Sequence, residues 1–301
     1  MIKRIEAKKM KRRQFLATTT KATFSAALLS TCRLKAESPS NWKIGIYTRP
    51  WSEHDYRTAL DAMVQAGYTY AGLMTSKKGL VIDVETNEKH AAQVGKEAKD
   101  RDLSILSVYG GQFYEDRSKK AAIRGLKKLI DNVHACGGQS LLLGGTGNKK
   151  TFNNYYNAVV ECCDYALQRE VKLTLKPHGG LNATGPECRK IIEKVDHPNF
   201  ELWYDPGNIY YYSDGYLDPT KDVDTVADII KGMCVKDFQA PKQVALTPGT
   251  GLVDFPVLFA KLKKSGFVSG PLVIECLDEG DLDTNLKQAK KAKRFLEKML
   301  P

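Results

Sequence analysis

The sequence predicts a single-domain (β/α)8 barrel, a fold in which eight parallel strands alternate with helices. Short apolar runs alternate with amphipathic stretches through most of the 301 residues. Several of these runs are apolar throughout, as expected of strands that are covered on both faces. No glycine-rich phosphate-binding fingerprint follows the first run, residues 43–48, and this argues against an open doubly wound sheet. One barrel of about 250 residues accounts for the chain beyond its N-terminal leader.

Eight apolar runs are the predicted strands, and each is short. They are residues 43–48, 68–74, 104–109, 140–143, 172–175, 201–204, 232–236 and 272–276. The stretches between them have helical periodicity. Apolar side chains recur every three or four positions in residues 119–136, and residues 153–168 are rich in apolar and aromatic side chains. Gly67, Gly137 and Gly266 follow such stretches, where a left-handed residue would end a helix.

The positive charge of the chain is concentrated at its N-terminus. The whole sequence has a formal net charge of +11, with 46 basic and 35 acidic residues. Residues 1–35 hold ten of the basic residues and one of the acidic ones, so the rest of the chain has 36 basic and 34 acidic residues. A nearly neutral body gives no electrostatic reason to expect a nucleic-acid partner.

Residues 1–35 have the features of an export signal in the usual order: basic residues, an apolar run at 17–30, and then Cys32. The pair Arg12-Arg13 before this run resembles a twin-arginine signal, and a disordered basic tail is the alternative. The run is too short and too polar to span a bilayer. We therefore expect a periplasmic protein, with membrane attachment through a lipidated Cys32 as an open alternative.

Residues 36–41 are predicted to be a linker, and residues 42–301 to be the barrel. The six cysteines beyond the leader show neither the spacing of a disulfide framework nor that of a zinc module. Most of them are expected to be small packing residues. The part after the linker contains no internal repeat, which is consistent with a single catalytic domain.

Polar side chains stand at the ends of the last four predicted strands. In a (β/α)8 barrel the reacting groups lie at the C-terminal ends of the strands and on the loops that follow. Lys176, Asp205, Cys234 and Glu275 occupy these positions. Because consecutive strand ends border one small space, we expect these four side chains to converge there.

Five motifs around these positions resemble the xylose-isomerase-like barrel family. They are residues 173–180 (LTLKPHGG), 204–208 (YDPGN), 235–238 (VKDF), 248–255 (PGTGLVDF) and 272–275 (LVIE). That family includes sugar isomerases, ketose epimerases, inosose dehydratases and lyases that act on oxidised glycosides. The resemblance covers residues 42–299 and implies a small-molecule saccharide substrate; many members form homo-oligomers. Abasic-site nucleases share this fold, but they need several histidine ligands and a basic groove, which this sequence does not offer.

The resemblance also implies a metal site, and here the sequence departs from the family pattern. Members hold one divalent ion with a Glu, an Asp, a His and a second Glu, one from each of the last four strands. Asp205 and Glu275 match two of these ligands, whereas Lys176 and Cys234 stand at the other two positions. An ammonium at Lys176 with two carboxylates has the same net charge of −1 as the ion with its three acidic ligands, so Lys176 could take the electrostatic role of the metal. In the alternative, His178 joins Asp205, Glu275 and Cys234 around one manganese, magnesium or zinc ion.

The family implies that the enzyme removes a proton next to a carbonyl of a sugar or keto-sugar, as an isomerase, epimerase or lyase. Glu275 is the candidate for the principal acid/base, and His178 is the candidate second proton carrier. Lys176 would hold the developing enediolate as an electrophile, and Asp205 would position Lys176 or a metal. A barrel that binds saccharide without turnover is the alternative, because Lys176 and Cys234 differ from the usual ligands.

Four further residues are candidates for substrate contact. Asn208 matches a polar substrate-contacting position of the family, and Lys236 and Asp237 lie at the end of the seventh predicted strand. The fourth is Trp51, after the first strand, which is a candidate for an aromatic wall that stacks on a sugar ring. The other candidates for this wall are Trp203, Tyr210, Tyr211 and Tyr212. A turn residue, an ion pair on the rim and packing in the core are the corresponding alternatives.

Overall fold

The computed structural model of the protein describes residues 41–300. The predicted export signal at residues 1–35, Cys32 within it, and the linker up to residue 40 lie outside the described residues. Within residues 41–300, no helix combines the length and the apolar character that crossing a membrane requires. The prediction of an exported protein therefore rests on the sequence.

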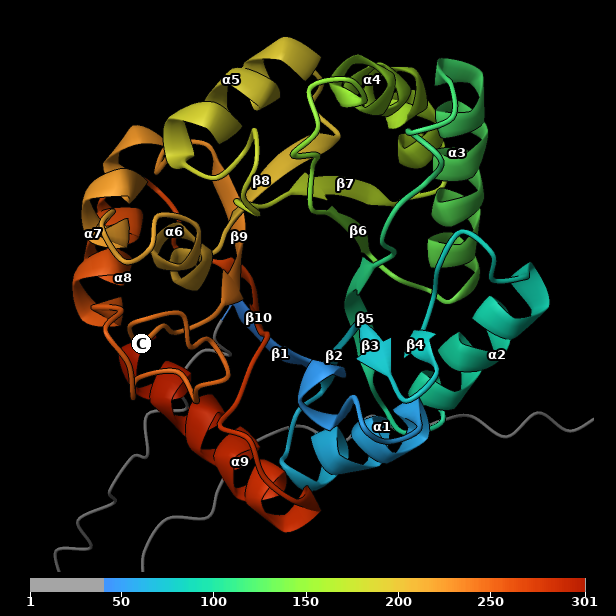
Figure 1. Cartoon of the computed structure of the whole chain (residues 1–301). Helices are drawn as coiled ribbons and strands as arrows, with labels where there is room; N and C mark the ends of the chain where they lie inside the picture. The colour runs from blue at the N-terminus through green and yellow to red at the C-terminus, as the bar shows by residue number, and fades with distance from the viewer. Residues whose placement is uncertain (1–40, 301) are drawn as a thin grey trace, which may run out of the picture. The chain divides into compact units, whose positions relative to one another are not determined.

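Eight parallel strands close into a barrel, which confirms the predicted (β/α)8 fold (Figure 1). Around the barrel the strands follow the order β1-β10-β9-β8-β7-β6-β5-β2. They are β1 (Trp42–Tyr47), β2 (Tyr70–Leu73), β5 (Ser104–Tyr109), β6 (Ser140–Leu143), β7 (Lys172–Leu175), β8 (Phe200–Tyr204), β9 (Ile230–Val235) and β10 (Gly270–Ile274). Each boundary lies within two residues of its predicted position. Two further strands, β3 (Thr75–Ser76) and β4 (Gly79–Leu80), form a small separate hairpin.

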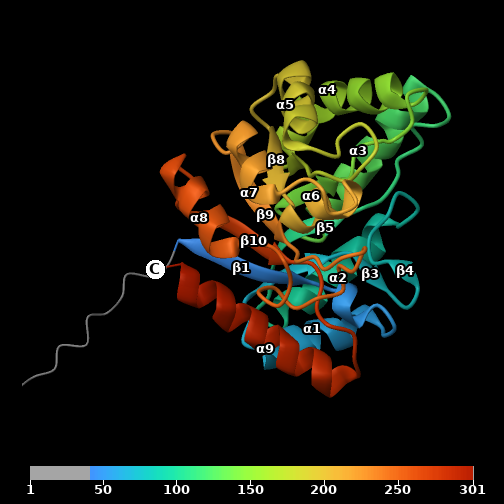
Figure 2. The ribbon, with the colours of Figure 1, turned by 60° about the vertical axis from the view of Figure 1, so that its left-hand side comes forward.

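Helices surround the barrel. They are η1 (Arg49–Trp51), α1 (Tyr56–Gln65), α2 (Glu88–Lys99), α3 (Lys119–Ala135), α4 (Phe152–Gln168), α5 (Gly185–Val195), α6 (Pro206–Tyr212), α7 (Pro219–Asp222), η2 (Val223–Thr225), α8 (Phe255–Lys264) and α9 (Leu282–Met299). Several begin at a side-chain cap: Asp55, Ser118 and Thr184 each accept a hydrogen bond from a backbone N–H of the first turn. The last helix, α9, packs beside α1 and closes the ring of helices (Figure 2).

The connection between β8 and β9 is divided into short helices, and its first helix, α6, begins directly at the barrel mouth. Asp205 is the N-cap of α6, and its Oδ1 accepts a hydrogen bond from the backbone N–H of Asn208 at 3.0 Å. Pro206 stands at the first helical position, where its missing N–H costs nothing. The turn after β8 therefore fixes the direction of the Asp205 side chain.

Two apolar layers hold the barrel together. The larger one lies between the strands and the helices and includes Trp51. The smaller one consists of Tyr47, Met74, Leu106, Leu142, Trp203, Cys234 and Val273. Gly232 makes room for the large ring of Trp203, because a Cβ at Gly232 would lie 2.6 Å from that ring. This inner layer is a packed floor, as is usual in such barrels.

Candidate active site

Four charged residues immediately follow four neighbouring strands and meet at the barrel mouth. Lys176 follows β7, Asp205 follows β8, Lys236 follows β9 and Glu275 follows β10. Each is at most 2% exposed. We call these four residues the strand-end ion cluster.

The two ammonium groups of the cluster each contact both carboxylates. Lys176 Nζ lies 3.1 Å from Asp205 Oδ2 and 2.5 Å from Glu275 Oε2. Lys236 Nζ lies 3.2 Å from Asp205 Oδ2 and 2.6 Å from Glu275 Oε1. The proximity of Lys176 and Asp205 was predicted from the sequence. Lys236 was predicted to contact the substrate, and its contacts with the two carboxylates were not predicted.

Arg49 is a third cation at this site, and its role was not predicted from the sequence. It lies in η1, just after β1, and its Nη1 is 2.5 Å from Glu275 Oε1. Its side chain is 39% exposed, so it connects the buried cluster with the surface. Three cations and two carboxylates give the site a net charge of +1. The charge predicted from the sequence was −1, because it counted Lys176, Asp205 and Glu275 alone. The place of Arg49 after a strand end is the signal that could have identified it.

The surroundings keep Glu275, Lys176 and Lys236 charged. Burial alone would raise the pKa of Glu275, but its three cationic neighbours hold that pKa well below its usual value. Burial likewise disfavours the charged forms of Lys176 and Lys236, but the two carboxylates raise the pKa of both lysines. The cluster is therefore a set of ions that stabilise one another and not a set of neutral groups.

His178 lies near the cluster but not in it. Strand β7 ends at Leu175, so His178 belongs to the following loop, and its ring contacts those of Tyr109 and Tyr212 at centroid distances of 6.2 and 5.6 Å. Burial, followed by the charges of Lys176 and Lys236, lowers the pKa of His178 to about 3. The imidazole is therefore neutral at physiological pH.

Three residues could hold a metal ion by their spacing alone. Ligand atoms of Asp205, Cys234 and Glu275 all lie within 4.8 Å of one another. Three of the four predicted ligands are therefore close together, whereas His178 does not belong to this group among the described residues, and its role as a ligand stays a prediction. The Cys234 thiol sits in the inner layer, 4.0 Å from the Tyr47 hydroxyl, and burial raises its pKa.

These donors fit a divalent cation poorly. Asp205 Oδ2 and both oxygens of Glu275 already contact ammonium or guanidinium nitrogens. A divalent ion would have to displace a buried ammonium and would enter a site that is already positive, at a large electrostatic cost.

Two of the residues predicted to contact the substrate have buried structural partners instead. Asn208 is 3% exposed; its Nδ2 donates to Pro177 O at 2.7 Å and its Oδ1 accepts from Lys236 Nζ at 3.0 Å. Asn208 therefore positions Lys236. Asp237 does not pair with Lys236 on the rim; its carboxylate accepts hydrogen bonds from the backbone N–H groups of Phe238, Gly249, Thr250, Gly251 and Val253.

The two tryptophans predicted to stack on a sugar are also buried. Trp51 is 1% exposed and packs in the outer core, and Trp203 is 2% exposed and fills the inner layer. Neither ring is available for stacking on a sugar in this structure. Tyr212 is 36% exposed, and both Tyr212 and Tyr109 lie against the ring of His178.

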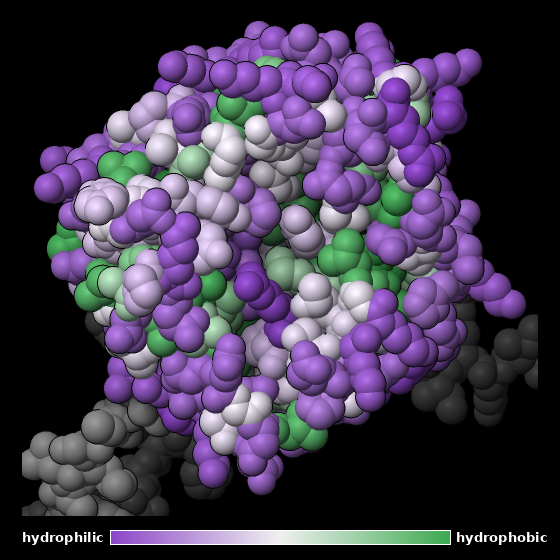
Figure 3. All heavy atoms as spheres, in the orientation of Figure 1, coloured by the Kyte–Doolittle hydropathy of each residue, from purple (hydrophilic) through white to green (hydrophobic). Residues whose placement is uncertain are grey.

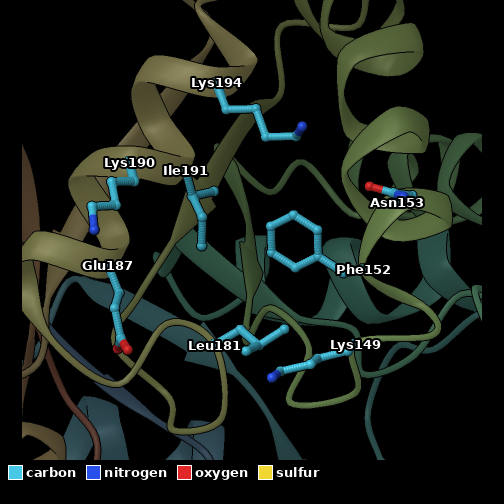
Figure 4. A pocket seen from close by; sticks show the side chains of 8 residues that line it. All are labelled: Lys149, Phe152, Asn153, Leu181, Glu187, Lys190, Ile191 and Lys194. Carbon is cyan, nitrogen blue, oxygen red and sulfur yellow. The ribbon is translucent and has the colours of Figure 1, made fainter.

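Hydrophilic side chains lie in a hollow over the centre of the barrel (Figure 3). A cavity of about 450 Å³ lies beside Arg49, between the loops that follow β1 and β10. A second cavity, of about 510 Å³, lies between α4 and α5, with Phe152, Leu181 and Ile191 at its centre and lysines around them (Figure 4). No residue that lines this second cavity belongs to the ion cluster.

Comparison with known proteins gives concordant matches. The sequence profile of the xylose isomerase-like TIM barrel family matches residues 60–299. An inosose dehydratase of Glaesserella parasuis serovar 5 (strain SH0165) is 24% identical over 300 residues, which cover 86% of this chain and 95% of that protein.

Two solved structures have the same fold. The D-allulose 3-epimerase of a Methylomonas species is 20% identical, with a TM-score of 0.68 over 87% of this chain and 99% of that one. The D-psicose 3-epimerase of Clostridium cellulolyticum H10, solved with D-tagatose, is 16% identical, with a TM-score of 0.69 over 86% of this chain and 99% of that one.

Proposed function

The chain belongs to the xylose isomerase-like TIM barrel family, and we propose that it is a carbohydrate isomerase, epimerase or lyase. In this proposal it removes a proton from the carbon next to the carbonyl group of a sugar or keto-sugar. The observation that carries the proposal is the position of Lys176, whose ammonium is buried between the carboxylates of Asp205 and Glu275 at the barrel mouth. Similarity to an inosose dehydratase and to ketose 3-epimerases supports a carbohydrate substrate.

Lys176 and Lys236 would act as the electrophile. Glu275 removes the proton, and the electron pair of the C–H bond forms the C=C bond of an enediolate. The carbonyl oxygen becomes an oxyanion, and a buried ammonium pair stabilises that charge far more than water would. Delivery of a proton from solvent to the opposite face of the same carbon gives an epimer, and delivery to the former carbonyl carbon gives an isomer. In a lyase reaction, Glu275 passes its proton to a neighbouring hydroxyl, which departs as water.

Glu275 needs a substrate to become an effective base. Its pKa is held low by its cationic neighbours, and a weakly basic carboxylate removes a carbon-bound proton slowly. A substrate carbonyl oxygen that accepts hydrogen bonds from Lys176 and Lys236 would draw these cations from Glu275. The pKa of Glu275 then rises when the substrate is in place, which confines the reaction to the complex.

His178 would serve as a neutral hydrogen-bonding group. With a pKa of about 3 its ring is not a charged acid at neutral pH. One ring nitrogen can donate to a sugar hydroxyl and the other can accept from one. This role replaces that of second proton carrier, which a group poised near the working pH would fill better.

The proposed reaction uses no metal ion. Lys176 stands at a ligand position of the family pattern and makes the ion contacts that a metal would otherwise make. Lys236 adds a second positive charge on the same two carboxylates. The ammonium pair thus replaces the ion as the source of positive charge.

We also propose that the protein is exported to the periplasm through residues 1–35, with Cys32 as a candidate for lipid attachment. The support is the basic segment with Arg12-Arg13, the apolar run and the cysteine in the sequence. Cell fractionation of the full chain tests this, with the double substitution Arg12→Lys and Arg13→Lys as the export-defective variant. Equal periplasmic amounts of both proteins would contradict the proposal.

Solvent hydrogen exchange tests the catalytic proposal. The purified protein is incubated in D₂O with D-fructose, D-tagatose, D-allulose or an inosose, and deuterium next to the carbonyl is followed by NMR. Wild-type protein should introduce deuterium into at least one of them, and Lys176→Met should not. Lys96→Met, at an exposed lysine paired with Asp100, is the matched control and should retain the wild-type rate.

A saccharide-binding protein without turnover is the second candidate function. It is favoured by the mutual pairing of the cluster, in which both oxygens of Glu275 contact cations and its pKa is low. Binding of a sugar by the wild-type protein without any deuterium incorporation would support this candidate and contradict the enzymatic one.

A further inference from the structure

The cavity beside Arg49 has the size of a ligand site and adjoins the strand-end ion cluster. Its volume of about 450 Å³ falls within the range of small-molecule sites. Its walls come from the loop after β1, the loop after β10, Ala245 and the first turn of α9. We call it the Arg49 cavity.

Arg49 lines the cavity and contacts Glu275 of the cluster. Its Nη1 contacts Glu275, which is the single hydrogen bond that the Arg49 side chain makes among the described residues. A guanidinium carries five N–H donors, so four remain for other acceptors. A ligand in the cavity that accepts from these donors would lie directly beside the group that we propose as the base.

Oxygen acceptors and apolar side chains share the rest of the cavity wall. Glu53 and Glu279 contribute carboxylates, Asp278 contributes one that already accepts hydrogen bonds from Thr247, and Asn285 contributes an amide. Asn285 is 5% exposed; its Nδ2 donates to Pro50 O at 2.8 Å, and its Oδ1 has no hydrogen-bond partner in the described part of the chain. A buried acceptor without a partner is costly, and a hydroxyl donor would satisfy it.

The charge of the wall selects among ligand classes. Three carboxylates and one guanidinium give a net charge of −2, which repels phosphates and sugar acids. A neutral polyhydroxyl compound has donors for the carboxylates and acceptors for Arg49. The chemistry of the cavity therefore matches a saccharide unit without ionised groups.

We propose that the Arg49 cavity binds a second, neutral saccharide unit, joined by a glycosidic bond to the sugar that reacts at the ion cluster. A glycoside or short oligosaccharide is then the preferred substrate, and a free monosaccharide reacts at the same cluster but binds more weakly. This inference rests on the proposed function, because it takes the reacting sugar to lie at the cluster. Arg49, shared by the two spaces, is the point at which the linked units meet.

Calorimetric titration compares maltose, cellobiose, lactose and lactulose, each of which has an open-chain carbonyl form, with glucose, fructose and galactose. At least one disaccharide should bind roughly tenfold more tightly than either of its own components, the gain expected from a few added polar contacts. Ala245→Trp fills the cavity without touching the cluster and should remove this gain. Asn153→Trp, an exposed residue of the cavity between α4 and α5, is the matched control and should keep it.

The outcomes separate the two proposals. Monosaccharide binding with no disaccharide preference in the wild-type protein would overturn the inference and leave the proposed function standing. A preference that survives Ala245→Trp would also overturn it, because the second unit would then lie elsewhere. If no saccharide binds at all, the proposed function fails and this inference fails with it.

Discussion

Two buried carboxylates at the barrel mouth, Glu275 and Asp237, have opposite kinds of partner. Glu275 is 1% exposed and contacts three side-chain cations, whereas Asp237 is fully buried and accepts five hydrogen bonds from backbone N–H groups. Side-chain cations can turn toward a ligand, so Glu275 can exchange partners during a reaction. Backbone donors cannot leave Asp237 unless the loop unfolds. The same chemical group therefore serves the reaction in one place and the scaffold in the other.

The largest effect is expected from Glu275→Gln. It leaves three cations with one carboxylate, so the free energy of unfolding should fall by about 3–5 kcal/mol. Deuterium exchange into the substrate should fall about 100-fold to 10,000-fold, because the base is lost. Urea denaturation and the exchange assay measure the two effects. Asp100→Asn, in an exposed ion pair, is the control and should cost at most about 1 kcal/mol. Equal stability of the Glu275→Gln and Asp100→Asn variants would contradict the stabilising role of the buried ion contacts of Glu275.

Asp237→Asn tests whether Asp237 contributes to stability and not to the reaction. The amide retains one acceptor oxygen, so part of the backbone N–H array of residues 249–253 loses its partner. The free energy of unfolding should fall by about 2–3 kcal/mol. The exchange rate per folded molecule should stay within about twofold of wild type, since Asp237 touches no cation of the cluster. A loss of exchange as large as that of Glu275→Gln, with unchanged stability, would place Asp237 in the reaction.

The pKa of His178, lowered by burial and then by Lys176 and Lys236, makes the stability of the protein depend on pH. This pKa is about 3 in the folded protein and about 6.5 in an unfolded chain. Between these values the unfolded state binds more protons, so this group's contribution to stability is present above pH 6.5 and is lost as the pH falls toward 3. The stability of the wild-type protein should therefore fall faster than that of His178→Asn between pH 7 and 4, by up to about 1.4 kcal/mol per pH unit. Parallel stability curves would contradict this account of His178.

The smallest effect is expected from Trp51→Phe. Trp51 is buried in the outer core, and its Nε1 has no hydrogen-bond partner among the described residues. The loss of ring area and the removal of an unsatisfied N–H oppose each other, so the free energy of unfolding should change by less than about 1.5 kcal/mol. Calorimetric affinity for saccharides should stay the same. A large loss of affinity would indicate that Trp51 contacts the saccharide.

The fold was predictable because it depends on local patterns. Short apolar runs alternating with helical periodicity identify strands and helices residue by residue, and all eight strands were found in this way. The strand-end rule brought Lys176, Asp205 and Glu275 to one place for the same reason. These features need no knowledge of which distant residues meet.

The partners of the site residues were not predictable, because they come from distant segments. Asp237 is bonded to a loop 12 to 16 residues further along the chain, and Arg49 reaches Glu275 across 226 residues. Nothing in the local sequence tells whether Trp51 turns toward the core or the mouth. β7 ends at Leu175, so the strand alternation on which the position of His178 beside Lys176 was predicted does not extend to His178.

The central claim, that an ammonium pair takes the place of a metal ion, is tested most directly by elemental analysis after dialysis against excess Mn²⁺ or Zn²⁺. The account predicts far less than one ion per chain for the wild-type protein. In the Lys176→Met and Lys236→Met double variant, Asp205 and Glu275 lose their ammonium partners, and ion binding should increase. One tightly bound ion per wild-type chain that Glu275→Gln removes would contradict the claim.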